Sequence, residues 1–286
     1  MRKIFYLLTL YIISSSCSLN KESRIEVIRL KSNIFNNERN LRIYLPAQYD
    51  GQKTFKVLYI NDAQNLFNSD SLRKKEDWRM DEITDSLISK GAIEPIIIVG
   101  IDNSGISNRG NEYLPWEDIY LNPPIPSPQG KQYPKFLINE VMPLIESKYK
   151  VKKGFENTGI GGFSYGGLIS IYTVMTIPKH FGYLLAETPS LYVNDKKLLV
   201  EANNSNNVWP KKVYIGVGTN ELALKNCNEE NGDNKMAVSD IKNLMSIIKK
   251  QHPKTEVNTN IVRCATHSFE EASRRLPQAL KFLYGQ

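Results

Sequence analysis

Residues 161–167 read Gly-Gly-Phe-Ser-Tyr-Gly-Gly and contain the spacing G-x-S-x-G, centred on Ser164. A strand-like run over Asn157–Gly161 precedes the serine, and a helix-like run over Leu168–Thr176 follows it. A serine hydroxyl is a weak nucleophile unless a sharp turn exposes it beside a base, and nearby glycines let strand and helix pack around that turn. The spacing alone arises by chance, but its strand-turn-helix setting makes Ser164 a candidate nucleophile.

The rest of the chain alternates strand-like and helix-like segments. The runs Lys56–Asn61 and Ile93–Ile101 are almost continuously apolar, which is typical of central strands covered by helices on both faces. Further strands are predicted over residues 24–30, 41–45, 183–186, 213–217 and 257–262. Further helices are predicted over residues 77–90, 136–149 (kinked at Pro143), 237–250 and 270–283. With 286 residues, 41% of them apolar, we predict one α/β domain with an open, mostly parallel, doubly wound sheet. Its ligands are expected beyond the carboxyl ends of the strands.

A serine nucleophile needs an imidazole base that is oriented by a carboxylate, and α/β-hydrolases carry them in the order Ser, Asp or Glu, His. Of the three histidines, His267 lies between a predicted strand and a predicted helix, where the base belongs. The other two read as a surface turn and a helix cap: His180 and His252. Glu221 follows the strand at 213–217, and Asp233, in a polar loop, is the alternative acid. The sequence therefore predicts the triad Ser164, Glu221 and His267.

An oxyanion hole needs two N–H donors aimed at one point. The backbone amide of Tyr165, directly after the serine, is the first candidate. The second is expected in the loop Asn61–Asn65, after an early central strand, and we favour Gln64.

With these residues, the chain resembles one esterase family of the α/β-hydrolases. That family includes feruloyl and acetyl-xylan esterases, siderophore esterases, S-formylglutathione hydrolases and mycolyltransferases. The resemblance runs from about Arg24 to the C-terminus. It rests on Leu-Arg-Ile-Tyr-Leu-Pro (41–46), Leu-Tyr-Ile-Asn-Asp-Ala-Gln-Asn-Leu-Phe (58–67), Trp78 with Asp81, and segments 99–103, 109–115, 162–166, 218–221, 266–268 and 275–280. It implies the α/β-hydrolase fold and carboxylic ester hydrolysis through an acyl-enzyme, without metal or cofactor. Two departures concern the pocket: Ala63 replaces the usual Gly, and residues 187–190 (Glu-Thr-Pro-Ser) replace a serine-rich segment.

Loops near the predicted strand ends supply candidate substrate contacts. Trp116, Tyr192 and Trp209 are candidates for stacking on aromatic acyl groups or sugars, although loop aromatics more often pack internally. Arg109 is a candidate clamp for an anionic or catecholate group, and the family pattern equally suits a structural pairing with Glu112. The expected substrate is a carbohydrate-linked or siderophore-type ester. The alternatives are an acyltransferase of the mycolyltransferase type and a non-catalytic ligand-binding surface lipoprotein.

The start of the chain has the features of an export signal. Arg2 and Lys3 precede an apolar run, and Ser14-Ser15-Ser16 leads to Cys17. Residues 1–16 therefore read as a signal peptide of the bacterial lipoprotein type, with Cys17 lipidated and residues 17–23 as a tether to a domain over residues 24–286. Ser14 departs from the aliphatic residue that such signals prefer, and an ordinary cleaved signal is the alternative. Either way the protein is expected to be exported, and the lipoprotein reading anchors it in the bacterial envelope.

Cysteine and charge usage bear on the compartment and on the partners. With Cys17 lipidated, Cys227 and Cys264 remain as an even pair, for which we predict a disulfide that braces the acid and histidine loops. Two free buried thiols are the alternative. The chain has 37 Lys and Arg against 30 Asp and Glu, spread along its length, which favours a solvated basic surface over a nucleic-acid site.

Overall fold

The computed structural model of the protein describes residues 22–67, 77–118, 123–227 and 231–285. Within them an eight-stranded sheet has the order β1-β2-β4-β3-β5-β6-β7-β8. The strands are β1 Arg24–Ser32, β2 Asn37–Leu45, β3 Lys56–Asn61, β4 Ile96–Ile101, β5 Thr158–Phe163, β6 Tyr183–Glu187, β7 Lys212–Gly218 and β8 Glu256–Val262. β2 is antiparallel to β1 and β4, and all pairs from β4 to β8 are parallel. The predicted mostly parallel sheet is confirmed.

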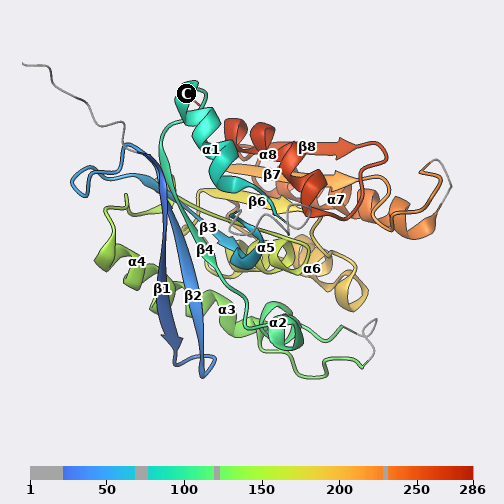
Figure 1. The fold of residues 1–286 in the computed structure, drawn as a ribbon. Helices are drawn as coiled ribbons and strands as arrows, with labels where there is room; N and C mark the ends of the chain where they lie inside the picture. The colour runs from blue at the N-terminus through green and yellow to red at the C-terminus, as the bar shows by residue number, and fades with distance from the viewer. Residues whose placement is uncertain (1–21, 68–76, 119–122, 228–230, 286) are drawn as a thin grey trace, which may run out of the picture.

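Helices cover both faces of the sheet (Figure 1). They are α1 Met80–Ser89, α2 Ile106–Tyr113, α3 Tyr133–Phe136, α4 Met142–Lys148, α5 Tyr165–Thr176, α6 Val193–Asn204, α7 Gly232–Gln251 and α8 Phe269–Tyr284. Alternation along β4 explains its continuous apolar run. Ile96 and Ile98 join the core under α1 and α8, whereas Ile97, Val99 and Ile101 join the core under α4 to α7. The doubly wound prediction is therefore confirmed.

Three details of the helices differ from the sequence pattern or refine it. The helix predicted over residues 136–149 is divided, because a π-helical turn over Leu137–Val141 lies just before Pro143. Helices α2 and α6 were not predicted. The first turn of α6 contains three residues with left-handed backbone angles, Asn194, Asp195 and Lys196, so no regular helical period runs through it.

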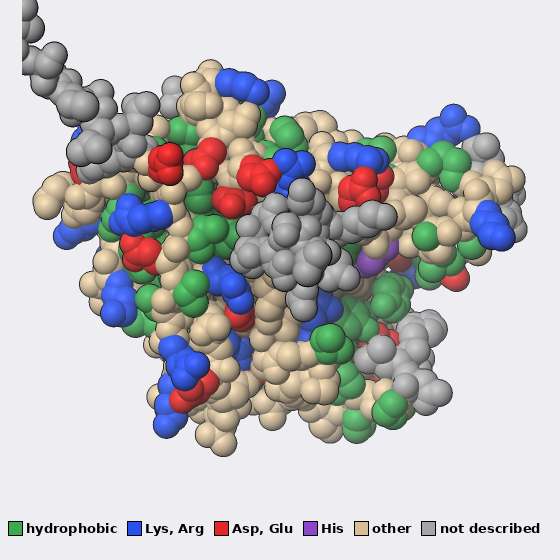
Figure 2. Space-filling model, in the orientation of Figure 1, with side chains coloured by type: hydrophobic (Ala, Val, Ile, Leu, Met, Phe, Trp, Pro, Cys, Tyr) green, Lys and Arg blue, Asp and Glu red, His purple; other side chains and the backbone are tan. Residues whose placement is uncertain are grey.

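The parts of the chain that bear on localisation lie mostly outside the described residues. Residues 1–16 and Cys17 are among those not described. None of the described helices is long and apolar enough to cross a membrane. On the face shown in Figure 2, basic side chains are interspersed with acidic ones rather than gathered into one patch.

Candidate active site

The turn at Ser164 joins β5 to α5 at the carboxyl edge of the sheet. Ser164 has φ 59° and ψ −121°, a strained conformation that non-glycine residues rarely adopt. Its backbone N–H donates to the carbonyl of Glu187 at 3.0 Å, which holds the turn against the end of β6. A Cβ at Gly162 would lie 2.5 Å from the backbone of Gly166, so the glycine before the serine is required by the close approach of strand and helix.

Glu221 and His267 meet beyond the ends of two neighbouring parallel strands. Glu221 lies three residues after β7, and His267 lies five residues after β8. Oε2 of Glu221 is 2.6 Å from Nδ1 of His267, while its Oε1 accepts from the backbone N–H of Gly218 at 2.7 Å. The glutamate side chain is 11% exposed and the histidine 37%. The carboxylate can therefore orient the imidazole and leave Nε2 available to a substrate or to the serine.

The imidazole also lies against the strand that carries the serine. The ring centroids of His267 and Phe163 are 4.6 Å apart, and Phe163 is the residue directly before Ser164. Within the described chain, the hydroxyl of Ser164 is hydrogen-bonded to Oγ of Ser190 at 3.2 Å, and no hydrogen bond joins it to His267. Catalytic hydrogen bonds of free enzymes are often loose and form in the substrate complex. The structure thus brings the three candidate residues to one edge, with the serine hydroxyl turned toward Ser190.

The loop after β3 lies beside the serine turn and contains one of the two candidate oxyanion donors. The side chain of Asn61 donates to the carbonyl of Gly166 at 3.2 Å, which attaches this loop to the start of α5. No described residue accepts a hydrogen bond from the backbone N–H of Gln64 or of Tyr165. Both amides are thus available as donors, although only Tyr165 is adjacent to the serine in the chain.

Ala63, the departure from the family pattern, fits this loop. The residue with the left-handed backbone is Asp62 (φ 64°), while Ala63 begins a 3₁₀ turn and is not among the residues with positive φ. The methyl group of Ala63 lies over Gly100 in β4, where an added Cβ would be 2.8 Å away. The backbone of the loop therefore does not require glycine at position 63.

Arg109 joins the loop after β3 to the serine turn. Its Nε and Nη2 lie 2.7 and 2.8 Å from the two carboxylate oxygens of Asp62, and Nη2 also donates to the carbonyl of Phe163 at 3.3 Å. The pairing of Arg109 with Glu112 that the sequence suggested is wrong. Glu112 instead pairs with Arg39 at 2.8 Å, because the side chain of Arg109 points toward the carboxyl edge of the sheet. Most of the donor capacity of Arg109 is thus used within the protein.

Two of the aromatic candidates are packing residues. Trp209 is 1% exposed, and its indole N–H donates to Oε1 of Gln251 at 3.0 Å. It precedes β7 and so lies at the amino edge of the parallel strands, opposite the candidate triad. Trp116 is buried edge-on against Tyr172 with centroids 5.4 Å apart. The prediction of a substrate contact is therefore wrong for Trp209, and the described structure uses Trp116 in the core.

Tyr192 lies at the candidate site. Its side chain is 38% exposed, and Ser190 and Tyr165 are near enough to affect the pKa of its phenol, which burial raises. The phenol of Tyr165 in turn donates to buried Asp118 at 2.6 Å, and burial together with this hydrogen bond raises the pKa of Tyr165. Two hydroxyl contacts thus lie beside the serine: Ser190 with Ser164, and Tyr165 with Asp118. The sequence placed residues 187–190 at the pocket but gave no role to Ser190 itself.

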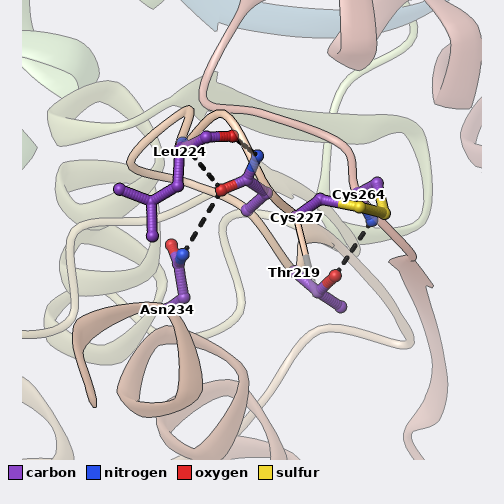
Figure 3. The surroundings of a disulfide bond; sticks show 6 residues. Thr219, Leu224, Cys227, Asn234 and Cys264 are labelled. Carbon is purple, nitrogen blue, oxygen red and sulfur yellow. Dashed lines mark hydrogen bonds between the residues drawn. A yellow bond between two sulfur atoms is a disulfide. The ribbon is translucent and has the colours of Figure 1, made fainter. Parts of the chain in front are cut away.

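A disulfide joins the acid loop to the histidine loop (Figure 3). Cys227 and Cys264 have an S–S distance of 1.96 Å and a Cα–Cα distance of 5.1 Å. The backbone N–H of Cys264 also donates to Oγ1 of Thr219 at 2.9 Å.

The alternative acid, Asp233, is exposed on the first turn of α7. Neither His180 nor His252 contacts a candidate catalytic group: they bond to neighbouring loop residues. Within the described residues, no group of His, Cys, Asp and Glu could hold a metal ion.

Comparison with known proteins agrees with the fold described above. A siderophore enterobactin esterase of Emericella nidulans is 29% identical over 160 residues, which cover 52% of this chain and 51% of that protein. An enterobactin esterase from Shigella flexneri, solved in the presence of enterobactin, gives a TM-score of 0.70 at 17% identity and covers 91% of this chain and 58% of that one. A ferulic acid esterase gives 0.66 at 17% identity, covering 93% and 99%. At such identities these structures show the fold, which is that of the α/β-hydrolases. Residues 32–283 match the family described as "Putative esterase", and the chain belongs to that family.

Proposed function

We propose that the protein is a serine esterase that cleaves carboxylic esters through an acyl-enzyme. The observation that carries the proposal is the Glu221–His267 pair at 2.6 Å, on the same sheet edge as a serine held with φ 59°. A strained, partly buried serine at a sharp turn and an oriented imidazole are the two parts that nucleophilic acyl transfer uses here. The family membership supports the reaction class.

The proposed reaction proceeds in two half-reactions. In the first, Nε2 of His267 takes the hydroxyl proton while Oγ of Ser164 bonds to the ester carbonyl carbon. The tetrahedral oxyanion is held by the backbone amides of Gln64 and Tyr165. Its collapse breaks the bond to the alcohol oxygen, which receives the proton from His267. In the second, water repeats these steps, releases the carboxylic acid and restores the serine. Glu221 stabilises the imidazolium throughout.

The proposed substrate is a carbohydrate-linked or siderophore-type ester. The relatives named above include a siderophore enterobactin esterase and a ferulic acid esterase. The hydroxyl groups of Ser190 and Tyr165, with the exposed Tyr192 nearby, support a polar acyl or alcohol group beside the serine. Hydrolysis of feruloyl, acetyl and catecholate esters by the purified protein, compared at equal concentration, would rank these groups.

The reaction class is tested by a fluorophosphonate probe and a short p-nitrophenyl ester. Wild type should label covalently, and Ser164→Ala should lose labelling and at least roughly a thousandfold of the hydrolysis rate while melting as a folded protein. Ser147→Ala is a matched control, because that serine is exposed on α4 and donates only to the carbonyl of Leu144 within the described chain. Full activity in folded Ser164→Ala would refute the proposal.

We also propose that the protein is exported and anchored through a lipid on Cys17. The support is the sequence of residues 1–17, and a disulfide downstream suits an oxidising compartment. Growth with a palmitate analogue should label wild type in the membrane fraction. Cys17→Ala should lose the label, and a wild-type chain without the label would refute the lipid anchor.

A further inference from the structure

A buried carboxylate lies directly behind the serine turn. Glu187 is the last residue of β6, and its side chain is 0% exposed. Its backbone carbonyl accepts the N–H of Ser164 at 3.0 Å. Any displacement of this residue is therefore passed through one hydrogen bond to the backbone of the candidate nucleophile.

The partner of this carboxylate comes from the helix that follows the candidate base. Arg275, in α8, is 2% exposed, and its Nε and Nη2 both lie close to Oε2 of Glu187, at 2.8 and 2.7 Å. The N-cap of α8 is Ser268, the residue next to His267, and its hydroxyl accepts the N–H of Glu271. The pair therefore connects the end of β6 to the helix whose first turn adjoins the histidine.

The same carboxylate also lies on the strand that leads to the acid. A Cβ at Gly216, in β7, would lie 2.4 Å from both carboxylate oxygens of Glu187, so only glycine leaves room for them. Two residues later Gly218 donates its N–H to Glu221. Burial raises the pKa of Glu187 to about 7 against the opposing effect of Arg275, and the charge of Glu221 is near enough to add to the rise. The pair thus contacts elements that carry all three candidate catalytic residues.

We propose that Glu187 and Arg275 are positioning residues that hold the serine turn, the acid strand and the histidine helix in register. This inference rests on the proposed serine esterase. A buried ion pair contributes little to stability compared with well-packed apolar side chains of similar volume, but it fixes the direction and distance between two elements. Small displacements between nucleophile and base reduce the rate of the chemical step far more than they reduce substrate binding.

The chain offers a matched control in a second buried ion pair. Arg39 and Glu112, 0% and 1% exposed, pair at 2.8 Å between β2 and α2, which carry none of the three candidate residues. Arg275→Met and Arg39→Met therefore each remove the guanidinium partner of a buried carboxylate, although Glu112 keeps hydrogen bonds from Asn37 and Asn108. Arg275→Lys keeps a cation opposite Glu187 without the guanidinium fork. The double variant Glu187→Met with Arg275→Met removes the pair without leaving a buried charge.

The experiment measures kcat and KM on a p-nitrophenyl ester, per active site titrated with the fluorophosphonate, together with thermal melting. We expect kcat to fall on the order of 10- to 100-fold in Arg275→Met and in the double variant, with KM changed less than about threefold. Arg275→Lys should retain most of the wild-type kcat. Arg39→Met should melt lower with kcat per site unchanged.

The outcomes separate this inference from the proposal on which it rests. Wild-type kcat in the folded double variant, or an equal loss of kcat in Arg39→Met, would overturn the positioning role. If Arg275→Met does not fold, the double variant and Arg275→Lys decide the question. Failure of wild type itself to label at Ser164 would instead refute the proposed serine esterase.

Discussion

Opening the disulfide between Cys227 and Cys264 should lower stability by an amount that follows from its place in the chain. The two cysteines are separated by 37 residues in sequence. A cross-link that closes a loop of this length restricts the unfolded chain and stabilises the folded one by about 4 kcal/mol at 25 °C. In a domain of this size the corresponding decrease in Tm is on the order of 10 °C. Melting of the purified protein with and without dithiothreitol measures this decrease.

Activity should respond less than stability to the same reduction. Three hydrogen bonds of 2.9–3.0 Å also join residues 219–220 to residues 262–265, so the acid and histidine loops stay connected when the sulfurs separate. We expect kcat on a p-nitrophenyl ester to fall less than tenfold at 25 °C, and thermal inactivation to begin on the order of 10 °C earlier. The double variant Cys227→Ser with Cys264→Ser should have the Tm and kcat of the reduced protein, and dithiothreitol should change neither. A Tm that reduction leaves unchanged, with both thiols alkylated afterwards, would refute the reasoning.

Three further perturbations test other parts of the structure. Because burial raises the pKa of Glu187 from an ordinary 4.5 to about 7, its contribution to stability is complete below pH 4.5 and is lost as the pH rises to about 7. As the pH rises from 4.5 to 8, the free energy of unfolding measured in urea should fall by about 3 kcal/mol more for wild type than for Glu187→Gln. If the free energy of unfolding changes with pH in the same way for both proteins, this expectation is contradicted. Asp62→Asn removes the charge that holds Arg109 and should lower kcat on the order of tenfold with little change in KM; a change confined to KM would show that Arg109 acts on substrate instead. Trp209→Phe should lower the free energy of unfolding by about 1–3 kcal/mol and leave KM unchanged. A raised KM would show instead that Trp209 contributes to substrate binding.

The fold could be predicted for the central strands, because a strand covered by helices on both faces of the sheet must be apolar along its whole length. Apolar runs such as Lys56–Asn61 have few alternatives to a central strand. Helix α2 was missed because its residues, Ile106–Tyr113, are mainly polar and are held by contacts such as Arg109 with Asp62, which are distant in sequence. Helix α6 was missed because its backbone is irregular at Asn194–Lys196. Tertiary contacts, rather than local periodicity, determine both.

The same distinction applies to the candidate site. Chain order and strand ends were enough to select Glu221 and His267, because parallel strands place all their carboxyl ends at one edge. The aromatic candidates had no such constraint. Trp209 and Glu221 flank the same strand, β7, yet they lie at opposite ends of it. Closeness to a strand in sequence therefore carries information only when the direction of the strand is included.

The contacts at the site also show where its geometry is least secured by local structure. The serine turn is held by Glu187, the last residue of β6, and by Ser190 from the segment after it. The acid and base are held by each other, by Gly218 at the end of β7, and by the disulfide between the segments after β7 and β8. Each half can thus keep its own geometry while the distance between the halves changes. Because the Glu187–Arg275 pair spans that division, its removal should appear mainly in the transfer of the proton from serine to histidine.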